Sequence, residues 1–325
     1  MILRSLLCAA ALAAASTARA ETHSFSPKTY YTTYSFAHPP ALRIKSGDRV
    51  ITKTIDAGGA DFEGKAVSTG GNPETGPFFI DGAEPGDSIV VTIEKVEINR
   101  ATAYSGSLLA PYAAHPQGIA ARKDSEPKRV IWNLDKVKNV ATLAEPGILP
   151  EDFSLPLRPM LGCIGVAPAR KEAIAANTPG NFGGNMDYAS LGAGVKVTLP
   201  VFEPGALLFL GDGHARQGEG EVVGTGLETS MDVVFTVELV KKKTISWPRV
   251  ETATHITVLG SSRNTLEAMQ LATMEMQQIL TADYGFTERG AQLLMGQAAE
   301  YEIANVVDPA FTVVAKMRKD LLPKK

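Results

Sequence analysis

Cysteine is scarce in this chain of 325 residues, which contains only Cys8 and Cys163. Cys8 falls in a predicted leader peptide, so one thiol is left and an internal disulfide is excluded. After residue 20, no apolar run approaches the about 20 residues that a membrane-spanning helix needs. Stability must therefore come from core burial, helped by a metal ion or by homo-oligomerisation.

Residues 1–20 have the three parts of a secretory signal peptide. Arg4 gives a basic start, residues 5–15 are apolar, and Ala18-Arg-Ala20 provides a small-residue cleavage site. The mature chain is expected to begin near Glu21 and to be periplasmic or secreted. Cleavage would remove Arg4 and Arg19 and no acidic residue, so the net charge of −3 would become slightly more negative. Neither nucleic acid nor an anionic membrane is therefore expected as a partner.

Residues 21–260 are predicted to form a mainly β body. β-branched residues dominate several short segments that follow Gly-Asp turns or other turn signals. In the first of them, Ile51 and Ile55 are expected on one buried side. The pattern predicts a β-sandwich or jelly-roll-like fold with an irregular insert around residues 100–175, and the absence of βαβ alternation excludes a Rossmann-type fold. The expected strands cover residues 50–56, 88–94, 195–199 and 232–240.

Residues 261–325 have a different character and are predicted to form a small C-terminal α/β unit packed on the body. Apolar residues at helical spacing predict a helix over residues 264–280. Thr287 is suited to capping a second helix that runs to about residue 304. Residues 311–315 then predict a closing strand.

The segment from Gly211 to Glu221 is rich in potential metal ligands. It follows an apolar run and contains Asp212, His214, Gln217, Glu219 and Glu221 among four glycines. A buried strand that ends in such a loop is typical of an active site. Imidazole and carboxylate groups together suit zinc or a similar divalent ion. On spacing alone, metal or catalytic use and a structural role remain equally open.

Three other segments carry candidate residues, each with a structural alternative. Gly183 and Gly184 permit positive φ and precede Asn185 and Asp187, but a tight loop with an Asp cap explains the same pattern. Asp56 ends a predicted strand before two glycines, where a turn cap is the simpler interpretation. Cys163 lies in an apolar run and is interpreted as buried filler rather than as a nucleophile.

Taken together, these segments closely resemble the acetamidase/formamidase family over essentially the whole mature chain. Family members often carry a histidine where this chain has Asn72. The resemblance rests on the following blocks, of which the last two are the most specific: Thr75-Gly-Pro77, Gly82-Ala-Glu-Pro-Gly-Asp87, Gly162-Cys-Ile-Gly-Val-Ala-Pro168, Gly183-Gly-Asn-Met-Asp187 and Gly211-Asp-Gly-His-Ala-Arg-Gln-Gly218.

The resemblance implies a β-sandwich enzyme that hydrolyses linear, short-chain amides to ammonia and a carboxylate with a bound divalent metal. Zinc is the expected ion, with calcium as the alternative. The matching positions with ligand chemistry are Asp56, Asp187 and His214. Further roles are expected for the following residues: Glu221 or Glu219 as the proton-transferring base, Asn185 in orienting the amide, and the backbone N–H groups of Gly183 and Gly184 in stabilising the oxyanion.

A rival function from another class is a non-catalytic or degenerate secreted sandwich that holds a metal or another ligand with the same loops. The carboxylates alone do not exclude it, because calcium is bound by several oxygens. His214 favours a zinc-like ion, whereas Asn72 favours a change or loss of activity.

Overall fold

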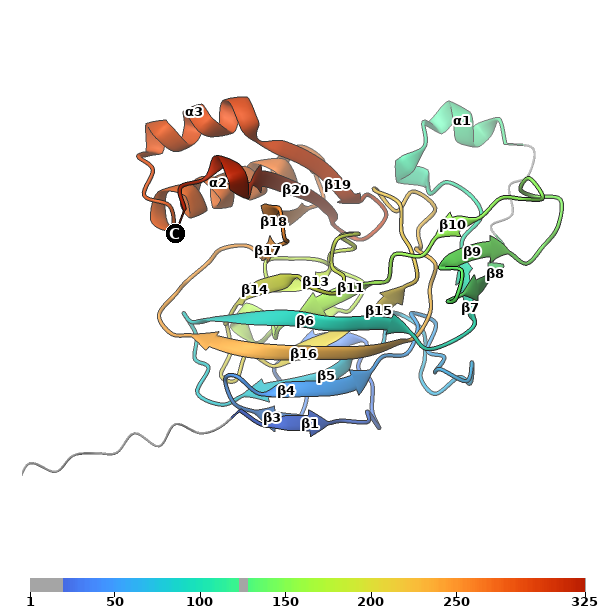
Figure 1. Ribbon diagram of the computed structural model, residues 1–325, viewed down its shortest axis with the longest axis horizontal. Helices are drawn as coiled ribbons and strands as arrows, with labels where there is room; N and C mark the ends of the chain where they lie inside the picture. The colour runs from blue at the N-terminus through green and yellow to red at the C-terminus, as the bar shows by residue number, and fades with distance from the viewer. Residues whose placement is uncertain (1–19, 123–127, 325) are drawn as a thin grey trace, which may run out of the picture.

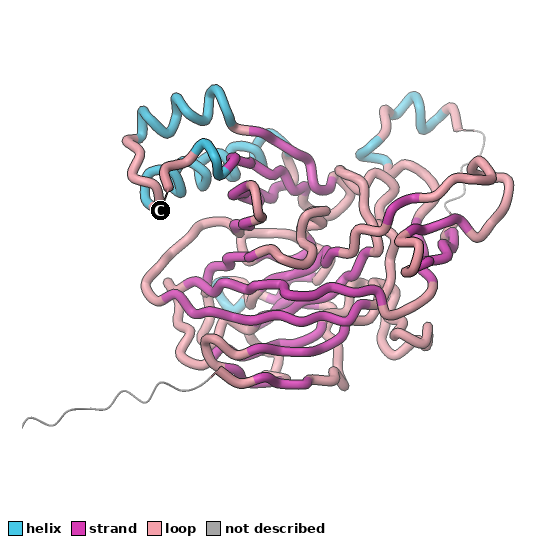
Figure 2. The backbone as a smooth tube through the Cα atoms, in the orientation of Figure 1, coloured by secondary structure: helices cyan, strands magenta, loops and turns pink. Residues whose placement is uncertain are grey.

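The computed structural model describes residues 20–122 and 128–324. The predicted signal peptide lies outside the described residues, apart from Ala20. The fold is mainly β, as predicted, with two large sheets stacked as a sandwich and helices confined to the periphery (Figures 1 and 2). None of the helices in the described ranges has the length and apolar character that crossing a bilayer requires.

The larger sheet has nine strands and runs from the N-terminal to the C-terminal part of the chain. Its strands pair antiparallel except for β1 and β4, which are parallel. In spatial order they are β1 (Thr22–Ser24), β4 (Arg49–Lys53), β16 (Met231–Val240), β6 (Ser88–Ile98), β14 (Lys196–Pro200), β17 (Arg249–Glu251), β18 (His255–Ser262), β20 (Phe311–Arg318) and β19 (Glu300–Asn305).

The second sheet of the sandwich has five strands and carries the candidate site. Phe78 from this sheet packs edge-on against Phe235 of the larger sheet, with ring centroids 5.2 Å apart, so both sheets share one apolar core. In spatial order its strands are β13 (Gly183–Asn185), β11 (Met160–Gly165), β15 (Leu208–His214), β5 (Thr75–Ile80) and β3 (Leu42–Ile44).

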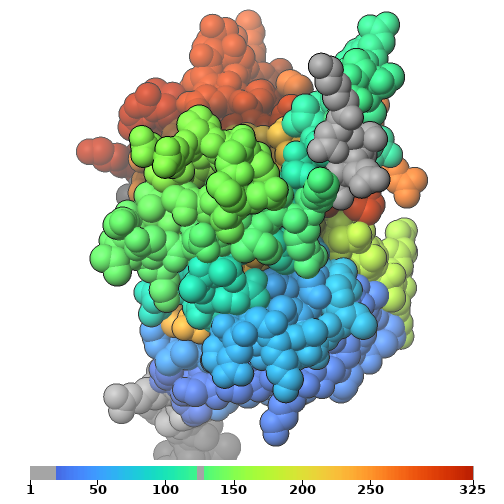
Figure 3. Space-filling view, turned by 90° about the vertical axis from the view of Figure 1, so that its right-hand side faces the viewer, coloured from blue at the N-terminus to red at the C-terminus, as the bar shows by residue number. Residues whose placement is uncertain are grey.

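The predicted irregular insert contains a small sheet of its own. Figure 3 shows this green segment on one face of the molecule, between the blue N-terminal strands and the red C-terminal part. Its strands are β10 (Leu155–Pro156), β9 (Val140–Leu143), β8 (Val130–Asp135) and β7 (Thr102–Ser105), and the short helix α1 (Pro116–Ala120) lies between β7 and β8 along the chain. A two-stranded pair elsewhere joins β2 (Thr33–Ser35) and β12 (Ala173–Ala175).

The C-terminal part adds two helices to the larger sheet rather than forming a separate sheet. In α2 (Thr265–Ala282), Asn264 caps the first turn by accepting hydrogen bonds from the N–H groups of Leu266 and Glu267. The predicted cap at Thr287 is also present, since its hydroxyl accepts from the Gly290 N–H at the start of α3 (Glu288–Ala298).

Two local predictions are wrong. The second C-terminal helix does not reach residue 304, because residues 300–305 leave it and pair with β20 as the edge strand β19. Ile51 does not face the core: it is 39% exposed, and Val50 and Thr52 point inward instead. In both places long-range strand pairing decides the outcome, which local periodicity cannot encode.

Candidate active site

The candidate site lies where β11, β13 and β15 bring polar side chains into the interior. β15 carries Asp212 and His214, and β11 carries Cys163. Asn185, the last residue of β13, lies opposite Cys163 in the strand register. All four side chains are buried. The predicted loop therefore starts later than expected, because residues 211–214 still belong to the strand.

A first group of potential metal ligands consists of Asp212, His214 and Glu228. Glu228 follows the glycine-rich loop and forms an isolated β-bridge with His214. The Nε2 atom of His214 lies 3.0 Å from Oε1 of Glu228 and 3.4 Å from Oδ1 of Asp212. His214 Nε2, Asp212 Oδ1 and Glu228 Oε2 are buried without a hydrogen-bond partner. One atom from each residue thus converges within 4.8 Å, as a cation site requires.

The other ring nitrogen of His214 is held by Gln217. The Nδ1 atom lies 2.8 Å from Oε1 of Gln217, whose Nε2 donates to the backbone oxygens of Asp187 and Ala304. Carbonyl oxygens only accept hydrogen bonds, so these contacts fix the orientation of the Gln217 amide. Its Oε1 must then accept from His214, which places a proton on Nδ1 and leaves Nε2 as the ring nitrogen that faces Glu228 and Asp212.

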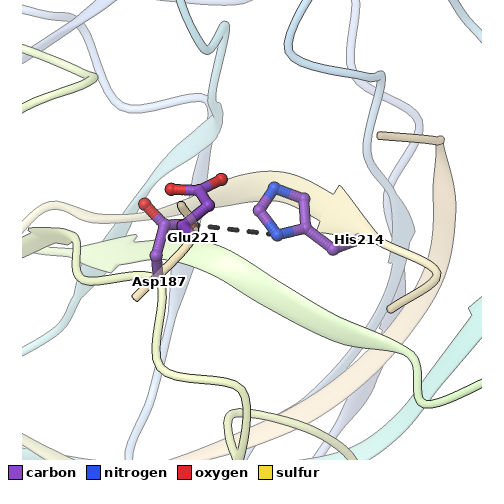
Figure 4. A group of neighbouring side chains, drawn as sticks. All are labelled: Asp187, His214 and Glu221. Carbon is purple, nitrogen blue, oxygen red and sulfur yellow. Dashed lines mark ion pairs between the residues drawn. The ribbon is translucent and has the colours of Figure 1, made fainter. Parts of the chain in front are cut away.

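A second group lies on the Nδ1 side of the imidazole and consists of Asp187, Glu221 and Asp308. Figure 4 shows the carboxyl groups of Asp187 and Glu221 next to the ring, with Oδ1 of Asp187 3.9 Å from Nδ1. The Asp187 carboxyl is also within hydrogen-bonding range of Glu221 and Asp308. Neither Asp187 oxygen has a donor, because these neighbours are themselves carboxyl groups. Asp308 is anchored from the other side by Nδ2 of Asn185 at 2.9 Å.

Glu74 and Cys163 form a third buried polar cluster next to Asp212. Both oxygens of Glu74 are fully buried without a hydrogen-bond partner. The Cys163 thiol donates to Oδ1 of Asn185 at 2.9 Å, and Nδ2 of Asn72 donates to Oδ2 of Asp212 at 3.1 Å. Cys163 is therefore buried, as predicted, but its neighbours are polar residues of the site.

These groups place six buried or half-buried carboxyl groups around one imidazole. Burial, with help from Asp212, raises the pKa of Asp187 to about 6, and burial raises the pKa of Glu228 to about 7. Burial likewise raises the pKa values of Glu74, Glu221 and Asp308 well above their ordinary range.

The pKa of His214 moves upward for the opposite reason. Burial alone would lower it, but the negative charges of Glu228 and Asp212 raise it well above its usual value. Within the described residues, His214 is the sole basic side chain that forms an ion pair with any of the six carboxyl groups. The site thus concentrates negative charge that a bound cation would neutralise.

Two glycines, Gly162 of β11 and Gly211 of β15, leave space for the buried carboxyl groups. A Cβ on Gly162 would lie 2.4 Å from both Asp187 Oδ1 and Asp212 Oδ2, and a Cβ on Gly211 would lie 2.6 Å from Oε2 of Glu74. Any side chain at either position would displace the carboxyl groups. Glycine is required here for close approach of the strands to the site.

The structure unites some of the predicted site residues and separates others. Asp187, His214 and Glu221 come together, and Asn185 lies beside them through Asp308. Asp56 does not join them: Arg100 Nη2 lies 2.7 Å from its Oδ2, and its Oδ1 accepts from the Ala60 N–H, so the turn-cap interpretation describes it. Glu219 is exposed and belongs to neither group.

The predicted oxyanion donor at Gly183 is also not available. Gly183 has the expected positive φ of 91°, but its N–H donates to the backbone oxygen of Gly180. Gly184, at φ 87°, sits in the register opposite Ile164 of β11. Both glycines serve close packing, since a Cβ on either would lie within 2.4 Å of a backbone oxygen.

Sequence reasoning missed Glu74, Glu228 and Asp308 as members of the site. Glu74 directly precedes the block Thr75-Gly-Pro77 that carries the family resemblance, which was a usable signal, whereas Glu228 lies outside the blocks named above. Asp308 lies in the connection between β19 and β20 and has no local motif. Its role depends entirely on how the last hairpin folds over β13.

Comparison with known proteins agrees with the motifs. The crystal structure of an acetamidase from Yersinia enterocolitica superposes with a TM-score of 0.80, at 33% identity over 96% of each chain. This chain belongs to the acetamidase/formamidase family. The family model itself matches residues 170–322. An acetamidase structure from Bacillus halodurans gives a TM-score of 0.78 at 26% identity, covering 92% of this chain and 98% of that one.

A curated relative extends the comparison to a eukaryote. A Schizosaccharomyces pombe protein provisionally named a formamidase is 26% identical over 225 residues. That match spans 51% of this chain and only about half, 51%, of the yeast protein. The predicted acetamidase/formamidase family is confirmed by these matches together.

Proposed function

We propose that this protein is a metal-dependent hydrolase of short linear amides that releases ammonia and a carboxylate. The enzyme class, an amidase, is that of the acetamidase/formamidase family. The observation that carries the metal dependence is the buried group of Asp212, His214 and Glu228, in which Gln217 holds the imidazole so that Nε2 faces the two carboxyl groups.

The residues fit a divalent cation of the zinc type. One imidazole nitrogen and two carboxylates provide the mixed nitrogen and oxygen ligands that zinc accepts, and three protein ligands leave a position for water or substrate. Three of the atoms concerned are buried without a partner, which would cost several kcal/mol in total if they stayed unsatisfied. Bound there, a divalent cation supplies positive charge that polarises a carbonyl and acidifies water.

The remaining carboxyl groups are suited to proton transfer. Amide hydrolysis requires a group that takes a proton from water and returns it to the departing nitrogen. Glu221 is buried and lies next to Asp187. It belongs to the glycine-rich loop between β15 and Glu228. We assign this transfer to Glu221, with Asn185 holding Asp308 in place beside it.

Burial of the site favours small substrates. Apart from the half-buried Asp308, every member of the two groups is at most 6% exposed. A primary amide with a short acyl chain needs little space and offers two N–H donors to the surrounding carboxylates. Formamide, acetamide and propionamide are therefore the substrates to test first.

The decisive experiment compares His214→Ala with Cys163→Ala. For each variant, zinc content is measured by elemental analysis, ammonia release is followed on the amide panel, and folding is checked by circular dichroism. His214→Ala should lose zinc and activity while staying folded, and Cys163→Ala should keep both, because burial raises the pKa of its thiol and disfavours the nucleophilic thiolate. Full activity of His214→Ala would refute the metal-dependent scheme.

One observation supports the rival, a non-catalytic metal-binding protein. By the family resemblance, a histidine is expected where this chain has Asn72, and the Asn72 amide donates a hydrogen bond to Asp212, a proposed ligand. Wild-type protein that holds zinc but releases no ammonia from any amide would favour this rival. Recovery of activity in Asn72→His would then show that the difference at this position is responsible.

We further propose that the protein is exported, on the basis of the leader-like residues 1–20. N-terminal sequencing of the protein recovered from the producing cell should give Glu21 as the first residue. The uncleaved N-terminus in an intracellular fraction would contradict export. Homo-oligomer formation stays a prediction.

A further inference from the structure

Arg129 is an exposed cation on the solvent side of the candidate active site. Its guanidinium carbon lies 3.7 Å from the ring centroid of Tyr104, so the two side chains are stacked. With the other residues that the structure describes, Arg129 forms neither a hydrogen bond nor an ion pair. The stacking therefore holds the guanidinium in place while its N–H groups stay available to a ligand.

Tyr104 connects Arg129 to the carboxyl groups of the site. The Tyr104 N–H donates to the backbone oxygen of Glu228 at 3.1 Å, and the Glu228 N–H donates back to Tyr104 at 2.8 Å. Burial and the negative charges of Glu228, Asp56 and Asp212 raise the pKa of Tyr104 above its ordinary value. The phenol therefore keeps its proton at neutral pH. Within the described ranges its hydroxyl has no hydrogen-bond partner, so it is available as a donor.

Gly58 leaves space beside these two donors. A Cβ on Gly58 would lie 3.1 Å from the Tyr104 hydroxyl and 3.5 Å from Nη2 of Arg129, so both groups border the same point. Gly58 does not have a positive φ, and its backbone conformation therefore does not require glycine. The missing side chain instead leaves room for a ligand atom that contacts both donors.

The carboxylate of Asp56 also borders this point, with Oδ1 3.3 Å away. Its charge is already compensated, because Arg100 Nη2 lies 2.7 Å from Oδ2 and the Ala60 N–H donates to Oδ1. The charge of Arg129 is not used in this way. An anion placed beside Gly58 would therefore meet a net attraction from Arg129.

The same loop leads directly to the proposed metal ligands. The N–H of Asn72 donates to the backbone oxygen of Ala57, the neighbour of Gly58, at 3.3 Å. The half-buried side chain of Asn72 reaches inward, where its Nδ2 donates to Oδ2 of Asp212 at 3.1 Å. The point beside Gly58 and the carboxyl group of Asp212 are thus linked through one residue. A substrate whose amide lies at Asp212 can extend its other end toward this point.

We propose that Arg129 and Tyr104 bind a carboxylate of the substrate, so that the enzyme prefers monoamides of short dicarboxylic acids. Guanidinium and phenol donors form charge-assisted hydrogen bonds with a carboxylate. Held on the solvent side, this carboxylate stays away from the buried carboxyl groups that would repel it. Water adds its hydroxyl to the acyl carbon, the C–N bond breaks, and the nitrogen leaves as ammonia with the remaining proton. The inference rests on the proposed function for this reaction and adds the substrate class.

The test compares succinamate and glutaramate with succinamide and glutaramide, which have the same size but no negative charge. For zinc-loaded wild-type protein, kcat/KM per amide group should be higher for each monoamide than for its diamide. Arg129→Gln should lower this ratio by about 10-fold or more, because it removes the charge. Tyr104→Phe keeps the stacking, removes one donor and should lower the ratio by a smaller factor. An unchanged ratio in Arg129→Gln would overturn the proposal.

Arg43→Gln is the matched control. Arg43 is also exposed and stacks on an aromatic ring, that of Phe79 at 3.8 Å, but its charge is paired with Asp81 on the far strand β3 of the five-stranded sheet. This variant should keep the wild-type ratio. An equal fall in Arg43→Gln would mean general attraction of anions and would also overturn the proposal. Circular dichroism confirms that each variant is folded.

Binding of succinate, measured by isothermal titration calorimetry, separates this inference from the proposed function. Succinate binding that weakens in Arg129→Gln, in a protein that releases no ammonia from any amide, would support the carboxylate site and refute the amidase function. Ammonia release from acetamide without any preference for succinamate over succinamide would refute the carboxylate site and leave the amidase function intact. Equal succinate affinity of wild type and Arg129→Gln would likewise refute the carboxylate site.

Discussion

Gln217 accepts a hydrogen bond from His214 Nδ1 at 2.8 Å and donates its own amide protons to the backbone of Asp187 and Ala304. This arrangement connects both sides of the site. Gln217 places a proton on Nδ1 of His214, the proposed ligand. Its hydrogen bond to the Asp187 carbonyl also holds the backbone that carries the Asp187 carboxyl group. A residue that carries no charge and performs no chemistry thus orients the imidazole.

We predict that Gln217→Met, which preserves volume but removes the acceptor, weakens zinc binding by about 10–100-fold. The imidazole would then be free to change tautomer and to rotate away from Asp212 and Glu228. Zinc affinity is measured by competition with a chromogenic chelator. Gln217→Glu retains an acceptor for Nδ1 and should bind zinc more tightly than Gln217→Met. Unchanged affinity in Gln217→Met would mean that the ring is held by other contacts.

Gly162 offers a test of crowding between the two carboxyl groups. A Cβ at this position lies 2.4 Å from one oxygen of Asp187 and one of Asp212, so Gly162→Ala should lower the free energy of unfolding by about 1–3 kcal/mol and weaken zinc binding. The matched control is Gly296→Ala on α3, where an added Cβ meets nothing within 4 Å. That change should stabilise the protein by about 0.5–1 kcal/mol. Urea denaturation measures the free energy of unfolding of both variants. If the two substitutions changed it equally, crowding at Gly162 would be contradicted.

The sequence was sufficient for the fold class because the long central strands carry a strong local signal. The β-branched run at residues 88–94 lies within β6, and residues 232–240 lie within β16. Short strands carry a weaker local signal. In β4, apolar residues occupy both alternating positions, so Val50 and Ile51 compete for the core and the pairing with β16 decides between them.

The site was predictable only where its ligands are close in sequence. Asp212, His214 and Glu221 lie within one segment of ten residues, and their chemistry is visible together. Asp308 and Glu74 reach the site by sheet topology, which no local pattern contains. Asp56 shows the converse error: its ligand chemistry was suitable, but Arg100, 44 residues away, occupies the carboxylate.

Asp56 should therefore matter for stability and not for metal binding. Asp56→Asn removes the charge that pairs with Arg100 in a contact where the two side chains are only 3% and 10% exposed. Breaking a buried pair in this way costs about 3–5 kcal/mol. The control, Asp81→Asn, breaks the exposed pair with Arg43 and should cost less than about 1 kcal/mol. Elemental analysis should find wild-type zinc content in both variants, and loss of zinc in Asp56→Asn alone would restore Asp56 as a ligand.

Asp48, which binds Glu21 and His23 at the N-terminal strand β1, should make the stability of the protein depend on pH. Burial tends to raise the pKa of Asp48, but hydrogen bonds from the N–H groups of Lys45 and Glu21 and from His23 together bring this pKa below its ordinary value. A lowered pKa in the folded state means that the stabilisation is present above the unfolded pKa of about 4 and is lost as the pH falls through the folded value.

Asp48→Asn should accordingly lower the free energy of unfolding at pH 7 by about 1–3 kcal/mol, since it weakens hydrogen bonds to a charged acceptor. The difference from wild type should shrink as the pH is lowered from about 5 to about 3, where the wild-type carboxylate takes up its proton. Urea denaturation of both proteins at several pH values measures this difference directly, which removes the contribution of every other titrating group. A difference that stays constant over this range would show that the charge of Asp48 does not hold β1 against β4.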